Sequence, residues 1–354
     1  KHLRHMAITE EVFIHEQDVR QFLEEKGITE LGRGGEGAVY FLRGHVVKVV
    51  NSDCAPAALR EICHMLHLNR NLRGGTMGER ARQDWPALLW VYVLSDGSLS
   101  IGMKPFDINE SHPPGCTLYE RLTFGPMMER IHLLSSIRAI ANSLLYCERQ
   151  GIIHHDLKPA NIYIPGNPHQ APVVFDLGQA LWRQSAWGRM WLRHEHNLHY
   201  WYNGTYRYMH RSRRLAHLGA VNAALRQAAT DKQKHALASY VPTFYDDVFA
   251  FARILRDTVS SKKTYLHPKD KLALRDFYHK IMGLQRRRGV ASGREESGLF
   301  KRLTSMFQHP PQVQPATTIL PEQRWGSMEH VLPELDKTLA TIVPLAELEF
   351  VRQK

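Results

Sequence analysis

The stretch Ile153-His154-His155-Asp156-Leu157-Lys158-Pro159-Ala160-Asn161-Ile162 decides the fold, together with Val173-Val174-Phe175-Asp176-Leu177-Gly178 further along the chain. In both, polar side chains stand beside short apolar runs that favour strands. Phosphoryl transfer needs a carboxylate that orients a hydroxyl group and oxygen ligands for Mg²⁺. Asp156 can supply the first, and Asn161 and Asp176 can supply the second. The two stretches therefore predict a phosphotransferase site.

A glycine pattern lies upstream of these stretches. Gly32, Gly34 and Gly37, followed by Val39, form G-x-G-x-x-G-x-V between two predicted strands. Only a residue without Cβ brings backbone N–H groups against phosphate oxygens. A dinucleotide-binding fold would need a helix after the glycines, whereas Val39-Tyr40-Phe41-Leu42 favours a strand. Taken alone, the pattern fits a phosphate-binding loop and a glycine-rich hairpin equally well.

Lys48 is a charged residue inside the apolar stretch Val46-Val47-Lys48-Val49-Val50. A strand lysine with a solvated amine is the simplest interpretation, because a buried unpaired lysine is costly. Glu61, on the next predicted helix, offers an alternative. Its carboxylate could hold Lys48 over a nucleotide phosphate by an ion pair.

Taken together, these residues resemble the serine/threonine protein kinases in order and spacing. The resemblance covers roughly residues 29–341 and implies an α+β, bilobal fold with a small strand-rich lobe and a larger helical lobe. Further matches are Gly204-Thr205-Tyr206-Arg207-Tyr208-Met209, Asp246-Asp247-Val248-Phe249-Ala250-Phe251 and Arg324-Trp325-Gly326-Ser327-Met328-Glu329-His330-Val331-Leu332. Of the two aspartates, Asp247 is the better match for the one that anchors the central helix in the family.

The resemblance implies ATP and Mg²⁺ as cofactors and a role for each motif residue. It assigns catalysis to Asp156, Lys158, Lys48 and Glu61, Mg²⁺ to Asn161 and Asp176, the nucleotide to Gly32, Gly34, Gly37, Val39, Val46, Met103, Lys104 and Phe106, and the substrate platform to Thr205. The segment that links the two lobes could lie one residue earlier or later than these assignments place it. Met103 also fits a plain core position. Lys158 and Thr205 are the residue types seen in members that act on serine and threonine.

Hydrophobic periodicity divides the chain into a strand-rich half and a helical half. Strands are expected within 28–50 and 87–103, and helices within 8–27, 55–70, 129–149, 244–256 and 271–283. The predicted organisation is an N-terminal extension or expression remnant at 1–27, a first lobe and hinge at 28–106, a second lobe at 107–345 and a tail at 346–354. An alanine-rich helical insertion is expected at about 215–243, and a basic one rich in glycine, serine and proline at 284–320.

Composition narrows the class of protein. The 354 residues are 43% hydrophobic, and no run of eighteen or more apolar residues predicts a membrane span. The first residues do not form a secretory signal. Cys54, Cys63, Cys116 and Cys147 contain no C-x-x-C pair, which argues against a zinc ribbon or a disulfide framework and favours the cytoplasm. The net charge of +11 favours acidic substrates, nucleic acid or a membrane surface.

The chain departs from the family pattern at three places. His155 replaces an arginine that pairs with phosphate on the activation segment, Leu177 replaces a phenylalanine, and A-P-E is absent after Met209. A neutral imidazole cannot copy a bidentate arginine–phosphate pair. We therefore expect residues 176–209 to reach their working conformation through their own packing, the 215–243 insertion or a regulatory partner, rather than through phosphorylation. The alternative is that Arg183 or Arg189 replaces the arginine.

Other functions remain open at this level. One is a kinase-fold phosphotransferase that acts on a non-protein hydroxyl group, and another is a binding scaffold without turnover, against which the complete set of motif residues argues. Basic stretches at 207–214 and 286–302 could bind nucleic acid, but such loops are more often solvated surface. His194, His196 and His199 could bind a metal, although solvated histidines are the simpler interpretation, and the neighbouring tryptophans could pack locally or meet a partner.

Overall fold

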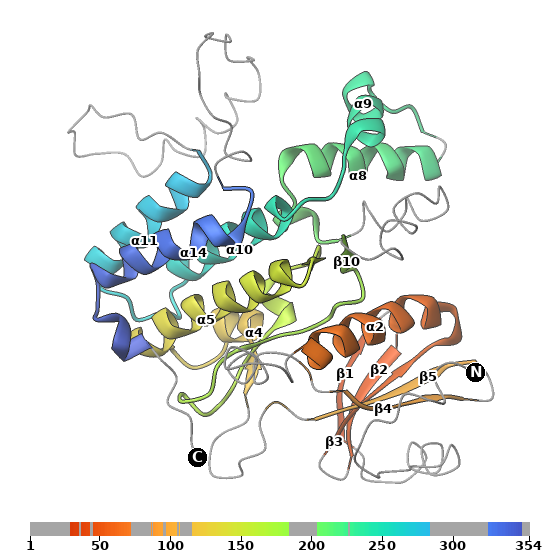
Figure 1. Cartoon of the computed structure of the whole chain (residues 1–354), viewed down its shortest axis with the longest axis horizontal. Helices are drawn as coiled ribbons and strands as arrows, with labels where there is room; N and C mark the ends of the chain where they lie inside the picture. Colours follow the sequence, from red (N-terminus) through yellow and green to blue (C-terminus); the bar gives the residue numbers. More distant parts are fainter. Residues whose placement is uncertain are drawn as a thin grey trace.

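The chain folds into a strand-rich part and a helical part (Figure 1). A computed structural model describes residues 29–34, 37–42, 45–71, 86, 88–94, 97–104, 106, 115–183, 204–225, 227–283 and 325–348. The strand-rich part comes first in the sequence, and helices dominate from residue 118 onward. This is the α+β class that the sequence predicts.

The strand-rich part is an antiparallel sheet with the strand order β1-β2-β3-β5-β4. Its strands are β1 (Thr29–Gly34), β2 (Gly37–Leu42), β3 (His45–Val50), β4 (Leu88–Val93) and β5 (Leu99–Met103). Helix α2 (Ala55–Asn71) follows β3 and the short 3-10 helix η2 (Ser52–Cys54), and lies beside the sheet (Figure 1). Its buried face carries Ala58, Ile62, Met65 and Leu68 at helical spacing. The predicted strands and the predicted helix are thus confirmed.

The helical part is built around α10 (Tyr245–Ser260), whose first turn carries two buried aspartates. The other helices are α4 (Leu118–Thr123), α5 (Arg130–Arg149), α11 (Pro268–Ile281), α14 (Met328–Ala340) and the 3-10 helix η7 (Leu345–Leu348). Helix α11 begins three residues before the predicted 271. Its start is set by Pro268 and by a capping box between His267 and Asp270.

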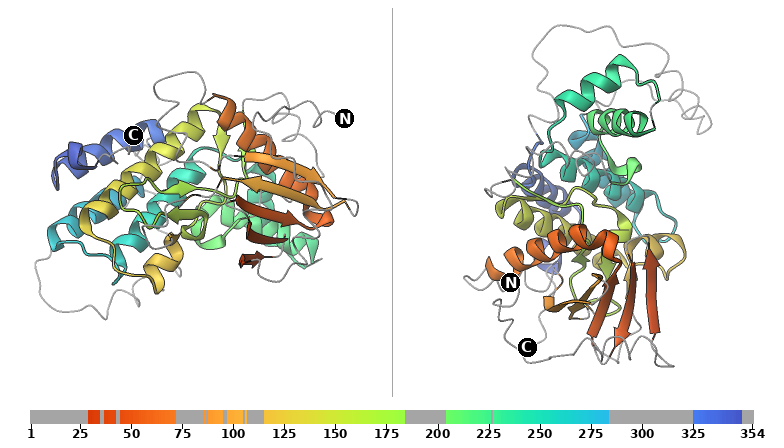
Figure 2. Two further views of the ribbon diagram at one scale, coloured as in Figure 1. Left: turned by 90° about the horizontal axis from the view of Figure 1, so that it is seen from below. Right: turned by 90° about the vertical axis from the view of Figure 1, so that its right-hand side faces the viewer.

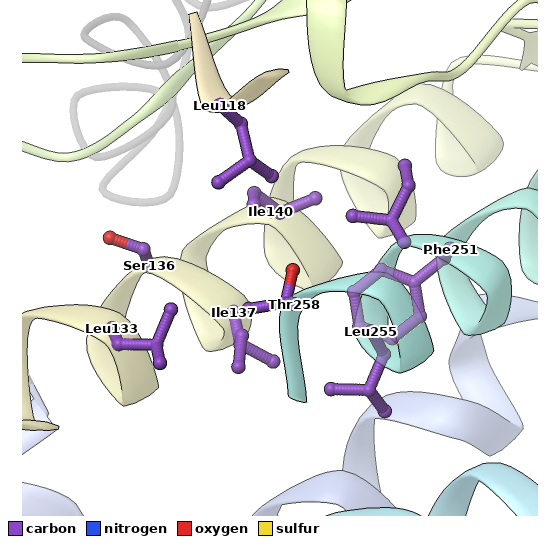
Figure 3. A pocket seen from close by; sticks show the side chains of 9 residues that line it. Leu118, Leu133, Ser136, Ile137, Ile140, Phe251, Leu255 and Thr258 are labelled. Carbon is purple, nitrogen blue, oxygen red and sulfur yellow. The ribbon is translucent and has the colours of Figure 1, made fainter. Parts of the chain in front are cut away.

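Buried apolar residues from both parts join in one connected cluster. It runs from Val50 and Ile62 in the strand-rich part to Leu134 and Val248 in the helical part. A small cavity within it, between α4, α5 and α10, is lined by apolar side chains and by Ser136 and Thr258 (Figure 3). No lining residue is titratable, so this cavity belongs to core packing.

Short strands frame the loops that carry the polar motif residues. Strand β8 (Ile162–Ile164) pairs with β6 (Cys116–Thr117) and β9 (Val173–Val174), and β7 (Ile152–Ile153) pairs with β10 (Leu181–Trp182). The 3-10 helix η4 (Pro159–Asn161) leads into β8. The loops from 154 to 161 and from 175 to 180 are thereby fixed at both ends.

Two helices form a hairpin where the alanine-rich insertion was expected. Helix α8 (Arg211–Ala224) follows the 3-10 helix η6 (Tyr206–Tyr208), and α9 (Asp231–Ser239) packs against it. A Cβ at Gly219 would lie 2.8 Å from the carbonyl oxygen of Gln233, so glycine allows this close packing. The hairpin begins at Arg211 rather than 215 and projects from the helical part (Figures 1 and 2).

Several predictions fall outside the described residues. They are the N-terminal helices at 8–27, the insertion at 284–320, Arg189, Arg324, and the histidines and tryptophans of 184–203. In the part that the structure describes, no helix is long and apolar enough to cross a membrane. The same residues contain no group of three or more His, Cys, Asp and Glu side chains suited to a metal ion.

Candidate active site

Lys48 and Glu61 form an ion pair between the sheet and α2. The distance from Lys48 Nζ to Glu61 Oε2 is 2.7 Å, and the two side chains are 16% and 7% exposed. Lys48 is paired across β3 with Val39 on one side and Ile101 on the other. The solvated interpretation of Lys48 is therefore wrong for this structure, because its amine is largely covered and held by a carboxylate.

The other residues expected around a nucleotide lie on neighbouring strands. Gly32 pairs with Val39 across the first two strands, and Val46 pairs with Met103 across β3 and β5. Met103 is partly buried against the core, which keeps the plain core interpretation open, and Lys104 beyond it is exposed.

The hairpin contains a glycine position at which the structure leaves no room for a Cβ atom. Gly34 pairs with Gly37 where β1 turns into β2. A Cβ at Gly37 would lie 2.0 Å from the carbonyl oxygen of Val49, so the approach of β3 alone requires glycine there. The hairpin interpretation therefore accounts for this glycine.

Phe106 links the end of the sheet region to the helical part. Its ring lies 5.2 Å from that of Tyr163 in β8 and 5.8 Å from that of Phe175. Phe175 directly precedes Asp176, so these ring contacts bring Phe106 close to the loops with the polar motif residues.

Asp156 receives hydrogen bonds from two other motif residues. Lys158 Nζ donates to Oδ2 at 2.6 Å, and Thr205 donates to Oδ1 from its backbone N at 2.7 Å and from its hydroxyl at 3.0 Å. The side chain of Asp156 is only 8% exposed. The structure thus brings Thr205, which is far along the chain, onto the proposed catalytic carboxylate.

Asn161 and Asp176 are brought together by backbone pairing. Phe175 N donates to Asn161 O at 3.0 Å, and Ile162 pairs with Val174. The Asn161 amide nitrogen donates to the carbonyl oxygen of Asp156 at 2.9 Å, so its side-chain oxygen is the atom left to serve as a ligand. Asp176 has a φ of +66°, a conformation that aspartate tolerates better than most residues.

These two side chains fit Mg²⁺. The Asp176 carboxylate is half-buried and has no hydrogen-bond partner among the described residues. Mg²⁺ prefers oxygen ligands, commonly one or two carboxylates completed by substrate phosphates and water. One carboxylate and one amide oxygen, carried by two segments that are paired through their backbones, make such a donor set.

Asp247 in the first turn of α10 holds the loop before Asp156. Its two oxygens accept from the backbone N of His154 at 2.7 Å and of His155 at 2.9 Å. Burial raises the pKa of Asp247 to about 6, against the lowering effects of His154 and of the two N–H donors. The contacts agree with the anchoring role that the resemblance implies for this aspartate.

Several buried polar residues of the structure were not among the residues predicted to form the site. His64 on α2 is buried and hydrogen-bonded to the backbone of Leu177, and its burial lowers the pKa to about 4. Its spacing of three residues after Glu61 was the only available signal. Arg213, Tyr240 and Asp246 were likewise missed, because Arg213 lies in a basic run and Asp246 was the weaker motif match.

Comparison with known proteins gives a partial match to kinases. A probable serine/threonine-protein kinase of Streptomyces coelicolor is 27% identical over 157 residues, or 43% of this chain and 22% of that protein. The serine/threonine-protein kinase PknB of Mycolicibacterium smegmatis is 30% identical over 158 residues, and PknB of Mycobacterium tuberculosis is 31% identical over 157. These matches cover 43% and 42% of this chain and 24% and 23% of the two relatives.

The matched region spans about a quarter of the length of these curated relatives, and no family model matches the chain. The partial similarity supports a divergent protein-kinase-like protein, and the strand-rich and helical parts of the structure agree with the bilobal α+β fold expected of one.

Proposed function

We propose that this protein is a serine/threonine protein kinase that uses ATP and Mg²⁺. The observation that carries the proposal is the set of contacts on Asp156. A carboxylate that accepts from both Lys158 and the Thr205 hydroxyl is poised to orient an incoming hydroxyl group and to accept its proton.

The nucleotide side of the site is supported by the Lys48–Glu61 ion pair at 2.7 Å. In this proposal Lys48 binds nucleotide phosphates, and the hairpin of Gly32, Gly34 and Gly37 covers them. Val39, Val46, Met103, Lys104 and Phe106 surround the base. Bound Mg²⁺, held by Asn161 and Asp176, would neutralise the charge of the phosphate oxygens.

The acceptor is a serine or threonine hydroxyl of a protein substrate. Lys158 can balance charge at the transferred phosphoryl group, because its amine already lies 2.6 Å from Asp156 Oδ2. The net charge of +11 favours an acidic substrate. Cys54, Cys63, Cys116 and Cys147 are all free thiols, which supports a reducing compartment such as the cytoplasm.

The test is incubation of the purified chain with labelled ATP, Mg²⁺ and a cell extract, followed by phosphoamino-acid analysis of the products. We expect label in phosphoserine and phosphothreonine, and loss of that label when Mg²⁺ is chelated. Predominant phosphotyrosine, or label only in lipid or nucleic acid, contradicts the acceptor class. ATP binding without any transfer would favour a scaffold.

A further inference from the structure

Arg213, in the first turn of α8, is a buried cation next to the substrate platform. Only 3% of its side chain is exposed. A Cβ placed on Gly204 would lie 2.6 Å from Arg213 Nη2, 3.2 Å from His155 O and 3.3 Å from Asp156 Oδ1. The guanidinium thus packs against the residue before Thr205, within reach of the catalytic loop. The φ of +123° at Gly204 also requires glycine there.

The Asp246 carboxylate is the common partner of the polar side chains around Arg213. Tyr240 Oη donates to its Oδ1 at 2.8 Å, His210 Nε2 lies 3.0 Å from the same oxygen, and Arg213 Nη1 lies 4.0 Å away. Thr243 N donates to the other oxygen at 2.9 Å. Burial opposes ionisation of Asp246, but His210 and Arg213 outweigh it and hold its pKa below the usual value.

His155 connects this group to the catalytic loop. Its Nε2 lies 3.3 Å from the Tyr240 hydroxyl, and its ring is almost fully buried. Its φ of +67° is unusual for a residue with a full side chain. The backbone of His155 is held by Asp247, and its side chain reaches Tyr240, which follows α9. Contacts therefore run without interruption from the residue before Asp156 to α10 and α8.

We propose that Arg213, His210 and Tyr240, gathered on Asp246, are positioning residues that lock the catalytic loop to the Thr205 segment in place of a phosphorylated residue. The proposal rests on the proposed kinase function and concerns how its site is kept assembled. A phosphorylated residue would normally offer negative charge to an arginine near Asp156. Here the chain supplies both charges itself, as the Asp246 carboxylate and the Arg213 guanidinium.

The same contacts explain how the substrate platform is held without A-P-E. The chain leaves Met209, enters α8 at Arg211 and returns through α9 to Tyr240. Both arms of this hairpin, which projects from the helical part (Figure 2), therefore bring a polar side chain to Asp246. This makes the 215–243 insertion a part of the catalytic scaffold.

The first experiment measures hydrogen exchange in the full chain and requires no turnover. Tyr240→Phe removes one hydroxyl group, and Arg213→Met removes the buried charge at similar length. Peptides covering 154–161 and 204–209 should exchange faster in both variants, with β3 and β5 unchanged. Tyr265→Phe and Arg275→Met, at exposed positions on or beside α11, are the matched controls. Unchanged exchange in Tyr240→Phe would overturn the proposal, even if Arg213→Met failed to fold.

The second experiment separates positioning from a merely structural role. Tyr240→Phe should lower kcat by about tenfold, the usual effect of losing one charge-assisted hydrogen bond, and Arg213→Met by about a hundredfold. The KM for ATP should stay constant, because Lys48 and Glu61 are untouched. Arg213→Lys should restore part of kcat. A rise in KM with constant kcat would contradict the positioning role.

Phosphatase treatment of the wild-type chain completes the test. We expect unchanged kcat, since Asp246 supplies the negative charge. Loss of activity on dephosphorylation, with recovery on rephosphorylation, would refute the inference while leaving the kinase function standing. Absence of any phosphotransfer by the wild-type chain would instead refute the kinase function, and the exchange experiment would still decide whether these residues hold the two segments together.

Discussion

Two groups of residues meet at Asp156, one proposed to carry out the chemistry and the other proposed to hold the site in position. The reactive cluster, formed by Lys48, Glu61, Asp156, Asn161 and Asp176, follows the kinase pattern and leaves the Asp176 carboxylate without a hydrogen-bond partner among the described residues. The anchor network, formed by His155, His210, Arg213, Tyr240 and Asp246, departs from the pattern and is buried. Within it, Tyr240 contacts His155 and Asp246, and His210 contacts Asp246. A reactive site keeps at least one polar group available to a ligand, whereas a positioning network uses its side chains mainly to hold other parts of the chain.

The largest effect should come from the reactive cluster. Replacing Asp156 with Asn keeps an oxygen that can accept from Thr205 but removes the base, so turnover should fall by about a thousandfold. The free energy of unfolding should hardly change, because the volume is nearly the same. Turnover at saturating ATP and urea unfolding check both expectations, with the exposed Asp231→Asn as control. Retained turnover would remove Asp156 from the mechanism.

A second substitution tests the nucleotide side of the same cluster. Lys48→Met should lower turnover by about a hundredfold, because one charged donor to the phosphates is lost. Glu61→Gln should have a smaller effect, since its amide oxygen can still accept from Lys48. Measuring kcat and the KM for ATP in both variants checks the order. Equal activity in wild type and Lys48→Met would return Lys48 to a purely structural role.

The reactive cluster could be predicted from the sequence far better than the anchor network. Each of its members lies in a short local motif, and its geometry follows from strand pairing, as when Phe175 bonds to Asn161. The helix at 55–70 and the strands around Lys48 also followed from periodicity. Such signals lie within a few residues of each other, so a sequence displays them directly.

The anchor network depends on contacts that no local pattern reveals. Arg213 lies in a basic run that predicts a solvated surface, yet it is buried because Asp246 lies beneath it, 33 positions along the chain. Tyr240 ends a helix with no motif and reaches His155 only through the fold of the hairpin. The sequence suggested that the insertion could support the activation segment but could not name the side chains. Burial of a charged residue is decided by a distant partner.

A third substitution tests Asp247, whose contacts lie between the reactive cluster and the anchor network. Asp247→Ala leaves the backbone N–H groups of His154 and His155 without their acceptor. It also removes a buried carboxyl with a raised pKa, which offsets part of the loss. We expect the free energy of unfolding to fall by about 2 kcal/mol, with turnover falling as well. Urea unfolding and kinetics measure both, and a stability loss with full turnover would separate the anchor from the site.

The smallest predicted effect is on how the free energy of unfolding depends on pH, through His155 of the anchor network. Burial, followed by the nearby Arg213, lowers the pKa of His155 well below 6.5, although Asp246 opposes this. His155 is then neutral when folded but protonates near pH 6.5 when unfolded, so the unfolded chain binds more protons below that pH. Between pH 7.5 and 5.5 this should lower the free energy of unfolding by about 1.4 kcal/mol.

The variant His155→Asn isolates that contribution. Asparagine tolerates a positive φ and does not titrate in this range, so its loss of stability from pH 7.5 to 5.5 should be smaller than that of the wild type by about 1.4 kcal/mol. Asp247, with its pKa raised to about 6, works in the opposite direction, because the folded chain takes up its proton first. His154, His210 and Asp246 also face this site, but all of them are present in both proteins and cancel in the comparison. The exposed His235→Asn should leave the pH dependence unchanged. Equal pH dependence in wild type and His155→Asn would mean that His155 takes up its proton as readily in the folded chain as in the unfolded one, and the anchor network would then have to accommodate a protonated His155 at pH 5.5.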